Sequence, residues 1–343
     1  MHIPDGYLSP ASCGTMYAIS VPFWYIAVNR VRKILTRRTV PVLAIFAAFS
    51  FVLMMFNVPI PGGTTAHAVG ATLLAIVLGP WAAILGISVS LGIQALFFGD
   101  GGLLSFGANC FNMAIVMPIV GYFVYKVISS DSEATSPRRI LGAVLGSYIG
   151  IVAASVTAGI ELGIQPILFH TANGTPLYAP YSLNVSLPAM LSTHLIVAGP
   201  IEAVVTGGVL VYLQRRHSSL IKADTPSKRE GKLWILWGFL GLLAFATPLG
   251  LLASGTAWGE WSVNELQHMG LGFIPTGLQK LADWWPAPLP DYGFPRMGAI
   301  VGYILSACAG IILIVFLLWI LGRWLSRRNL PAERTTSQQD NIE

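Results

Sequence analysis

The chain contains 343 residues, of which 54% are hydrophobic and only 10% are charged. Its mean hydropathy is +0.67, and several apolar stretches reach roughly 18–25 residues, the length that crosses a bilayer as a helix. These values exclude an ordinary water-soluble domain. The formal net charge of +5 raises nucleic-acid binding as an alternative, so the placement of the basic residues has to decide between the two.

We predict an all-α integral membrane protein with about nine spanning helices. The predicted spans are Cys13–Asn29, Val40–Phe56, Thr64–Leu78, Trp81–Phe98, Leu103–Ile128, Ile140–Ile167, Leu183–Leu213, Leu233–Leu252 and Met297–Leu321. The third is short and follows Pro59, Pro61, Gly62 and Gly63. We expect it to be broken or tilted beside a cavity, because irregular backbone at membrane depth must be buried in protein or hydrated.

The basic residues sort by side once the loops are numbered from these spans. Only Lys280 and Arg296 fall on one side, and the other 18 of the 20 Lys and Arg residues fall on the opposite side. By the positive-inside rule the N-terminus lies outside and the C-terminus in the cytoplasm of a multi-pass plasma-membrane protein. The basic residues are therefore topology signals, and we expect no nucleic-acid partner.

Two polar linkers, Ser129–Arg139 and Arg215–Lys232, divide the chain. The second suggests two domains: residues 1–217, with seven helices, and residues 218–343, a two-helix hairpin around a large outer loop at about 253–296. The sixth span carries small residues every fourth position, a pattern for close helix packing in lipid. They are Gly142, Gly146, Gly150, Ala154 and Ala158. The partner helix, in this chain or another subunit, stays open.

The chain opens with Met1 and His2 and lacks the basic start of a secretory signal. We expect Met1 to be retained, because the residue after it is a bulky histidine. Such a start offers a metal three nitrogens: the terminal amine, the deprotonated amide nitrogen of His2 and its imidazole. The amine and amide close a five-membered chelate ring, and the imidazole closes a six-membered one. Planar nitrogen coordination favours Ni(II) or Cu(II) and leaves one in-plane position open.

His67 is the candidate for that fourth position. It follows the Pro61–Ala66 run at the start of the third predicted span, which the charge pattern places on the same outer side as Met1 and His2. We therefore predict one site built from Met1, His2 and His67.

Other polar residues lie inside apolar spans, where ionisable groups are costly and point to function. Glu161 and Glu202 are candidates to attract a cation near its path, and the alternative is that each forms a hydrogen-bonded contact between helices. The remaining candidates are His194, Asn109, Asn112 and Gln94 as residues that orient the imidazoles or line the path, and Asp5 and Asp100 as residues that steer cations. Three scattered cysteines form no metal motif.

Three segments carry a resemblance to a known family. They are MHIPDGYLSP at the start, Pro22-Phe23-Trp24, and PGGTTAHAVG at residues 61–70. Together they resemble the substrate-binding component of cobalt/nickel energy-coupling-factor transporters, the CbiM/NikM family, over roughly residues 1–215. The second part, with TPLG at 247–250 and PDYG at 290–293, resembles the small N component of nickel transporters, here fused.

The resemblance implies that Met1, His2 and His67 hold the metal, transported Ni(II) or, less favoured, Co(II). It also implies two kinds of partner: a T-type transmembrane subunit and ABC-type ATPases that supply energy for uptake. The sequence has no phosphate-binding loop of its own, so we expect a transport subunit and not an enzyme. The alternatives are a secondary metal transporter without an ATPase partner and an intramembrane enzyme using Glu161 and Glu202.

Overall fold

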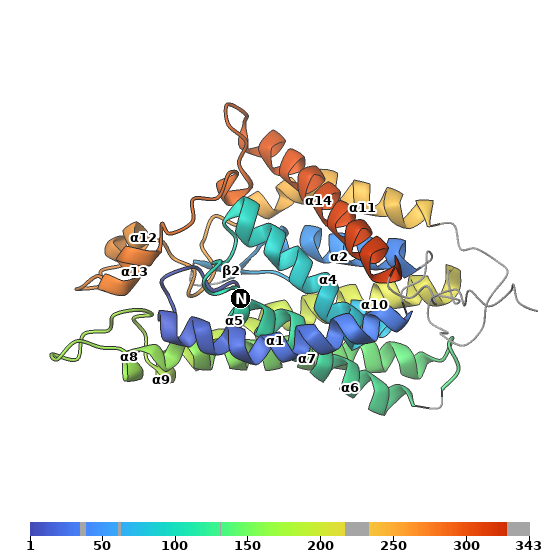
Figure 1. Ribbon diagram of the computed structural model, residues 1–343, viewed down its shortest axis with the longest axis horizontal. Helices are drawn as coiled ribbons and strands as arrows, with labels where there is room; N and C mark the ends of the chain where they lie inside the picture. Colours follow the sequence, from blue (N-terminus) through green and yellow to red (C-terminus); the bar gives the residue numbers. More distant parts are fainter. Residues whose placement is uncertain (35–38, 61–62, 131, 217–232, 328–343) are drawn as a thin grey trace, which may run out of the picture.

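The computed structural model describes residues 1–34, 39–60, 63–130, 132–216 and 233–327. They form a bundle of long helices that run roughly parallel and antiparallel to one axis (Figure 1). The first half contains α1 (Pro10–Ile34), α2 (Thr39–Met54), β1 (Val58–Ile60), β2 (Thr64–Ala66), α3 (Ala71–Leu78), α4 (Pro80–Ile93), η1 (Gln94–Phe98), α5 (Phe106–Asn109), η2 (Cys110–Val116), α6 (Met117–Ser129) and α7 (Pro137–Gly163). The second half contains α8 (Gln165–Leu168), α9 (Leu183–Thr193), η3 (His194–Ala198), α10 (Gly199–Arg216), α11 (Trp234–Ala246), η5 (Thr247–Leu252), α12 (Val263–His268), α13 (Thr276–Leu281), η6 (Pro290–Tyr292) and α14 (Ala299–Arg327).

Seven helices in the described part of the chain are long and apolar enough to cross a membrane, and α2 is a shorter apolar helix. Together they match eight of the nine predicted spans within a few residues. The third predicted span is different. Residues 64–66 pair with 58–60 in an antiparallel hairpin, and only Ala71–Leu78 is helical. The Pro and Gly residues before position 64 favour a turn, and the eight-residue α3 is too short to span alone.

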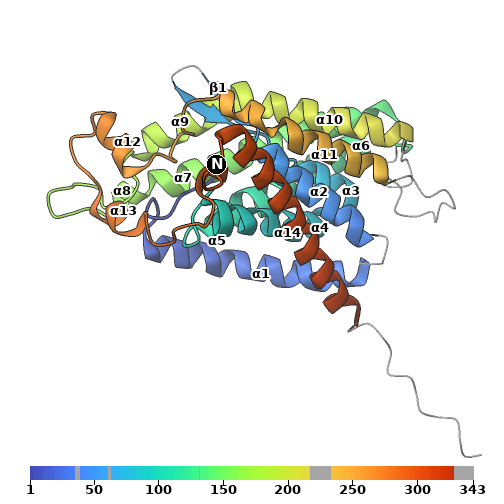
Figure 2. The same ribbon diagram turned by 90° about the horizontal axis from the view of Figure 1, so that it is seen from above.

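The helix ends sort onto two ends of the bundle. Figures 1 and 2 show the starts of α2, α7 and α11 at one end, together with the last turns of α1, α6, α10 and α14, while α8, α9, α12 and α13 gather at the other. The basic residues in the last turns of α1, α6 and α10 therefore lie at one end of the bundle. The domain boundary predicted at 217/218 lies outside the described residues.

The small-residue ridge of α7 packs inside this chain. A Cβ on Gly146 would lie 2.5 Å from the Gly121 carbonyl oxygen in α6, and one on Gly150 would lie 2.7 Å from the Met117 carbonyl oxygen. Backbones this close require glycine. The partner helix left open by the sequence is α6.

The C-terminal hairpin of α11 and α14 packs against α2, and α14 also contacts α4. A Cβ on Gly310 would clash with the Phe51 ring, and one on Gly322 would meet Val40 at 2.7 Å. This docking brings the outer loop between α11 and α14 over the N-terminal half of the protein.

Candidate metal centre

The first residues of the chain are buried inside the bundle and not at its edge (Figures 1 and 2). Asn109 holds the Ile3 backbone on both sides: its Oδ1 accepts from the Ile3 N–H at 2.7 Å, and its Nδ2 donates to the Ile3 carbonyl at 3.1 Å. Asp5 accepts the backbone N–H groups of Leu103 and Leu104. A Cβ on Gly102 would clash with the Asp5 carboxylate. The loop after η1, together with Asn109 of α5, therefore fixes the position of the first residues of the chain.

His67 lies between β2 and α3, and Glu202 of α10 fixes the backbone that follows it. The Glu202 carboxylate accepts the Val69 N–H at 2.7 Å and the Gly70 N–H at 3.0 Å. Gly70 has φ of 77°, a conformation that glycine adopts at no steric cost. These bonds set the turn that aims the imidazole inward.

The two imidazoles face each other, with ring centroids 5.1 Å apart. His67 Nδ1 lies 3.2 Å from the Ala68 carbonyl oxygen and must be the donor to it, which leaves Nε2 with a lone pair. His2 Nε2 lies 3.4 Å from Gln94 Oε1, and its proton there leaves the lone pair on Nδ1. Both His67 Nε2 and His2 Nδ1 are buried and have no hydrogen-bond partner within the described residues.

Hydrogen bonds beyond the rings fix the His2 tautomer. Gln94 Nε2 donates to Asp100 Oδ2 at 3.1 Å and to the Tyr292 hydroxyl at 2.9 Å, so Oε1 is the atom turned toward His2. The Tyr292 hydroxyl donates to Asp100 Oδ2 at 2.5 Å. The outer loop of the C-terminal hairpin thus orients a candidate metal ligand through Gln94.

Burial keeps both imidazoles neutral, which is the form that binds metal. Desolvation lowers the pKa of His2 to about 4 and the pKa of His67 well below its usual value, and the nearby terminal ammonium adds to both shifts. That ammonium is buried and pairs with Glu260 Oε1 at 3.1 Å. The His2 backbone N–H, unlike that of Ile3, donates to no acceptor within the described ranges.

The arrangement therefore offers four nitrogens from Met1, His2 and His67. Two are buried lone pairs that lack a partner, and one is an amide free of competing bonds. Unpaired buried acceptors cost free energy, and a divalent cation would satisfy them. Nitrogen donors of this kind suit Ni(II) and Cu(II).

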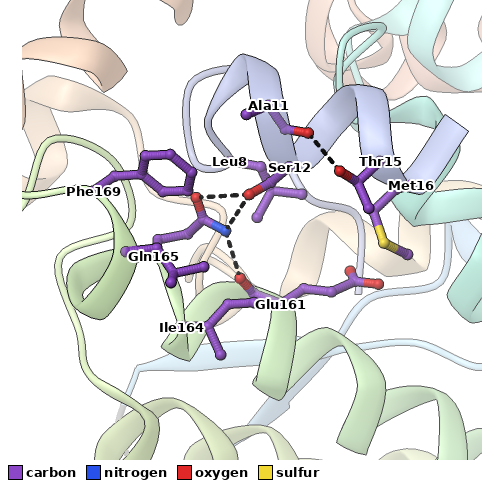
Figure 3. A pocket seen from close by; sticks show the side chains of 10 residues that line it. Leu8, Ala11, Ser12, Thr15, Met16, Glu161, Ile164, Gln165 and Phe169 are labelled. Atoms are coloured by element: carbon purple, nitrogen blue, oxygen red, sulfur yellow. Dashed lines mark hydrogen bonds between the residues drawn. The ribbon is translucent and has the colours of Figure 1, made fainter. Parts of the chain in front are cut away.

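The other sequence candidates occupy different places. His194 is buried at the start of η3, where Nδ1 donates to the Met190 carbonyl at 2.7 Å. Glu161 of α7 instead accepts from Asn112 Nδ2 at 2.8 Å. The Glu161 side chain lines a pocket of about 220 Å³ between α1 and α7–α8 (Figure 3). Within the part of the chain that the structure describes, neither Glu161 nor Asn112 makes a hydrogen bond to the two imidazoles.

Two residues from the C-terminal outer loop that lie next to the candidate ligands were not predicted from the sequence. Glu260 pairs with the terminal amine, and Tyr292 bonds Asp100 and Gln94. Tyr292 has φ of 59°, which costs on the order of 1–3 kcal/mol for a residue with a Cβ. It is held there by stacking on Phe98, 4.8 Å between centroids, and by the Ser306 hydroxyl, which donates to its carbonyl.

Three π-helical segments, η1, η2 and η3, begin at or next to candidate residues. Gln94 begins η1, Asn109 precedes η2, and His194 begins η3. Such widened helical turns are rare in proteins overall, and where they occur they often lie at functional sites.

Comparison with known proteins places these residues in context. Residues 2–220 match the family described as "Cobalt uptake substrate-specific transmembrane region" (CbiM), and residues 232–327 match the "PDGLE domain". The "Fused nickel transport protein NikMN" of Rhodobacter capsulatus is 47% identical over 330 residues, which cover 92% of this chain and 95% of the relative. The "Probable fused nickel transport protein LarMN" of Lactiplantibacillus plantarum is 48% identical over 346 residues, covering 98% and 100%.

A solved structure is also similar to the N-terminal part. The "Crystal Structure of an Truncated Transition metal Transporter" is 56% identical, with a TM-score of 0.59, and covers 63% of this chain and 100% of that chain.

Proposed function

Since this chain belongs to the CbiM family and carries a PDGLE domain, as fused nickel transport proteins do, we propose that it is the substrate-binding subunit of an energy-coupling-factor importer for Ni(II). It is a multi-pass membrane protein, and its similarity to named transport proteins accords with a role in binding and passing a metal and not in catalysis. Co(II) is the second candidate substrate, because relatives include the "Cobalt transport protein CbiM" of Streptococcus sanguinis.

The observation that carries the proposal is the pair of buried, unpartnered nitrogens, His2 Nδ1 and His67 Nε2, on facing rings. His2 Nδ1 is the ring nitrogen that closes a six-membered chelate with its own amide nitrogen, and the Met1 amine adds the five-membered ring. His67 Nε2 fills the fourth position.

Four nitrogens in a plane favour Ni(II) over Co(II), which more often takes higher coordination numbers. Cu(II) binds such donors more tightly in general, so its exclusion rests on which metal is available.

The metal enters from the outer side in this proposal. The N-terminus and the loop between α11 and α14 face outward, and the basic linkers face the cytoplasm. A T-type transmembrane subunit and two ABC-type ATPases then drive release on the inner side. We also propose that residues 1–217 form the metal-binding unit and residues 218–343 the fused N component.

The test is Ni(II) binding to purified protein by isothermal titration calorimetry. His2→Ala and His67→Ala each remove one ring nitrogen and should abolish nanomolar binding. A variant with one alanine added before Met1 keeps every side chain but displaces the amine, and should lose tight binding as well. His170→Ala, which alters an exposed histidine in the loop between α8 and α9, is the matched control. Nanomolar Ni(II) binding by His2→Ala or by His67→Ala would contradict the proposed function.

A further inference from the structure

We propose that Glu260, Asp100 and His2 form an entry site that holds the divalent cation before the four nitrogens close around it. The inference rests on the proposed function and concerns the route to the same centre. One ligand atom from each of these three residues lies within 4.8 Å of the other two. Two of the ligands are carboxylate oxygens, and the third is an imidazole nitrogen that the final site also uses.

Two hydrogen-bond acceptors, on Asp100 and His2, lie unusually close together at this position. Asp100 Oδ1 lies 3.2 Å from His2 Nδ1, yet Nδ1 makes no hydrogen bond within the described residues. The proton of the ring is on Nε2, facing Gln94, so a carboxylate oxygen and a nitrogen lone pair face each other. Two acceptors at this distance repel unless a cation lies beside both.

Glu260 already holds a positive charge at this place. The only hydrogen bond or ion pair of its carboxylate within the described residues is with the Met1 ammonium, at 3.1 Å. Without metal, the Met1 ammonium is the positive partner of the Glu260 carboxylate, and an arriving metal ion takes its place. When the metal binds, the amine proton and the His2 amide proton leave to water, and the freed nitrogens become ligands.

The exposed fractions of the four side chains indicate which of them an arriving cation meets first. The Glu260 and Asp100 side chains are 17% and 19% exposed, whereas His2 is 2% and His67 is 6% exposed. A cation arriving with its water shell therefore meets the two carboxylates first. Oxygen ligands suit a hydrated cation. His2 Nδ1 can then stay bound while the amine, the amide and His67 replace the oxygens.

The first test is the association rate of Ni(II) with the full chain, measured by stopped-flow absorbance. Glu260→Gln keeps the shape of the side chain and removes its charge, and we expect association at least about tenfold slower, in line with electrostatic capture of ions. The final spectrum of planar four-coordinate nickel should be unchanged. Asp283→Asn removes a charge from an exposed position on the same outer loop and should leave the rate unaltered. An association rate for Glu260→Gln within twofold of wild type would overturn the entry site.

The second test isolates the oxygen ligands from the nitrogen site. His67→Ala removes the fourth nitrogen but leaves Glu260, Asp100 and His2 in place. Mn(II), which prefers oxygen ligands, should bind to this variant with an altered electron paramagnetic resonance spectrum. The binding should be lost in His67→Ala/Glu260→Gln and kept in His67→Ala/Asp283→Asn. Absence of bound Mn(II) in His67→Ala, or its persistence without Glu260, would contradict the inference. Loss of planar nickel in the wild type would instead contradict the proposed function alone.

Discussion

The two buried glutamates of the spans provide a matched pair of perturbations. Glu202 accepts the backbone N–H groups of Val69 and Gly70, two and three residues after His67, whereas Glu161 accepts from Asn112 and makes no hydrogen bond to either imidazole within the described residues. Substitution by glutamine replaces a buried carboxyl group with an amide in each case. Any general effect of altering a buried carboxylate is therefore shared, and the difference between the two variants reports the role of Glu202.

The magnitude follows from the bonds that are lost. In Glu202→Gln the new side chain would keep one acceptor oxygen, so one N–H group of Val69 or Gly70 would face an amide NH₂ group. Loss of a hydrogen bond to a charged acceptor costs about 1.5–3 kcal/mol. If positioning His67 for binding then costs about 2 kcal/mol of the binding free energy, Ni(II) affinity falls about thirtyfold. In Glu161→Gln the Asn112 bond can persist, and the affinity should stay within about twofold of wild type.

Isothermal titration calorimetry of purified Glu202→Gln and Glu161→Gln with Ni(II) measures both values directly, and thermal unfolding without metal reports their stability. Equal affinities in the two variants, whether both unchanged or both reduced, would refute the assignment of Glu202 as the residue that positions His67.

The remaining predictions concern protons and the outer loop. Because burial lowers the pKa of His2 to about 4, its imidazole stays neutral between pH 5.5 and 8, and protonation of the ring does not compete with metal there. The amide proton must still leave, so Ni(II) affinity should fall by at least about tenfold per pH unit as pH decreases; a flat titration would exclude amide coordination. Tyr292→Phe keeps the ring on Phe98 but removes the hydroxyl that orients Gln94 and Asp100, and should weaken Ni(II) binding about 10–100-fold. Tyr303→Phe, a change to the ring packed edge-on against Tyr292, should not weaken binding; equal losses in both would show a packing effect instead.

The elements with strong local signals could be predicted from the sequence. Eight spans were placed because long apolar runs determine membrane helices largely on their own. The third span was expected to be broken or tilted, but its first three residues, 64–66, form one strand of a hairpin with residues 58–60, and a hydropathy pattern does not distinguish such a strand from a short helix. The close contact of α7 was predicted from its small residues, while its partner α6 depended on tertiary packing.

The candidate site likewise contains residues that could be predicted from the sequence and residues that could not. Met1, His2 and His67 could be proposed because the chelating chemistry of a terminal Met-His pair is local. Glu260 could not, since it is one acid in a long loop that reaches Met1 across 259 positions only after α14 has docked on α2. Tyr292 lay in a run noted for resemblance, but its bond to Asp100 depends on the same docking.

The central claim is that one nickel ion is held by four nitrogens from Met1, His2 and His67. X-ray absorption at the nickel K-edge, recorded on the full chain loaded with one equivalent of Ni(II), tests it most directly. The account predicts four nitrogen neighbours in a planar arrangement, with no sulfur from the Met1 side chain. A six-coordinate ion with oxygen neighbours in the loaded state would contradict it.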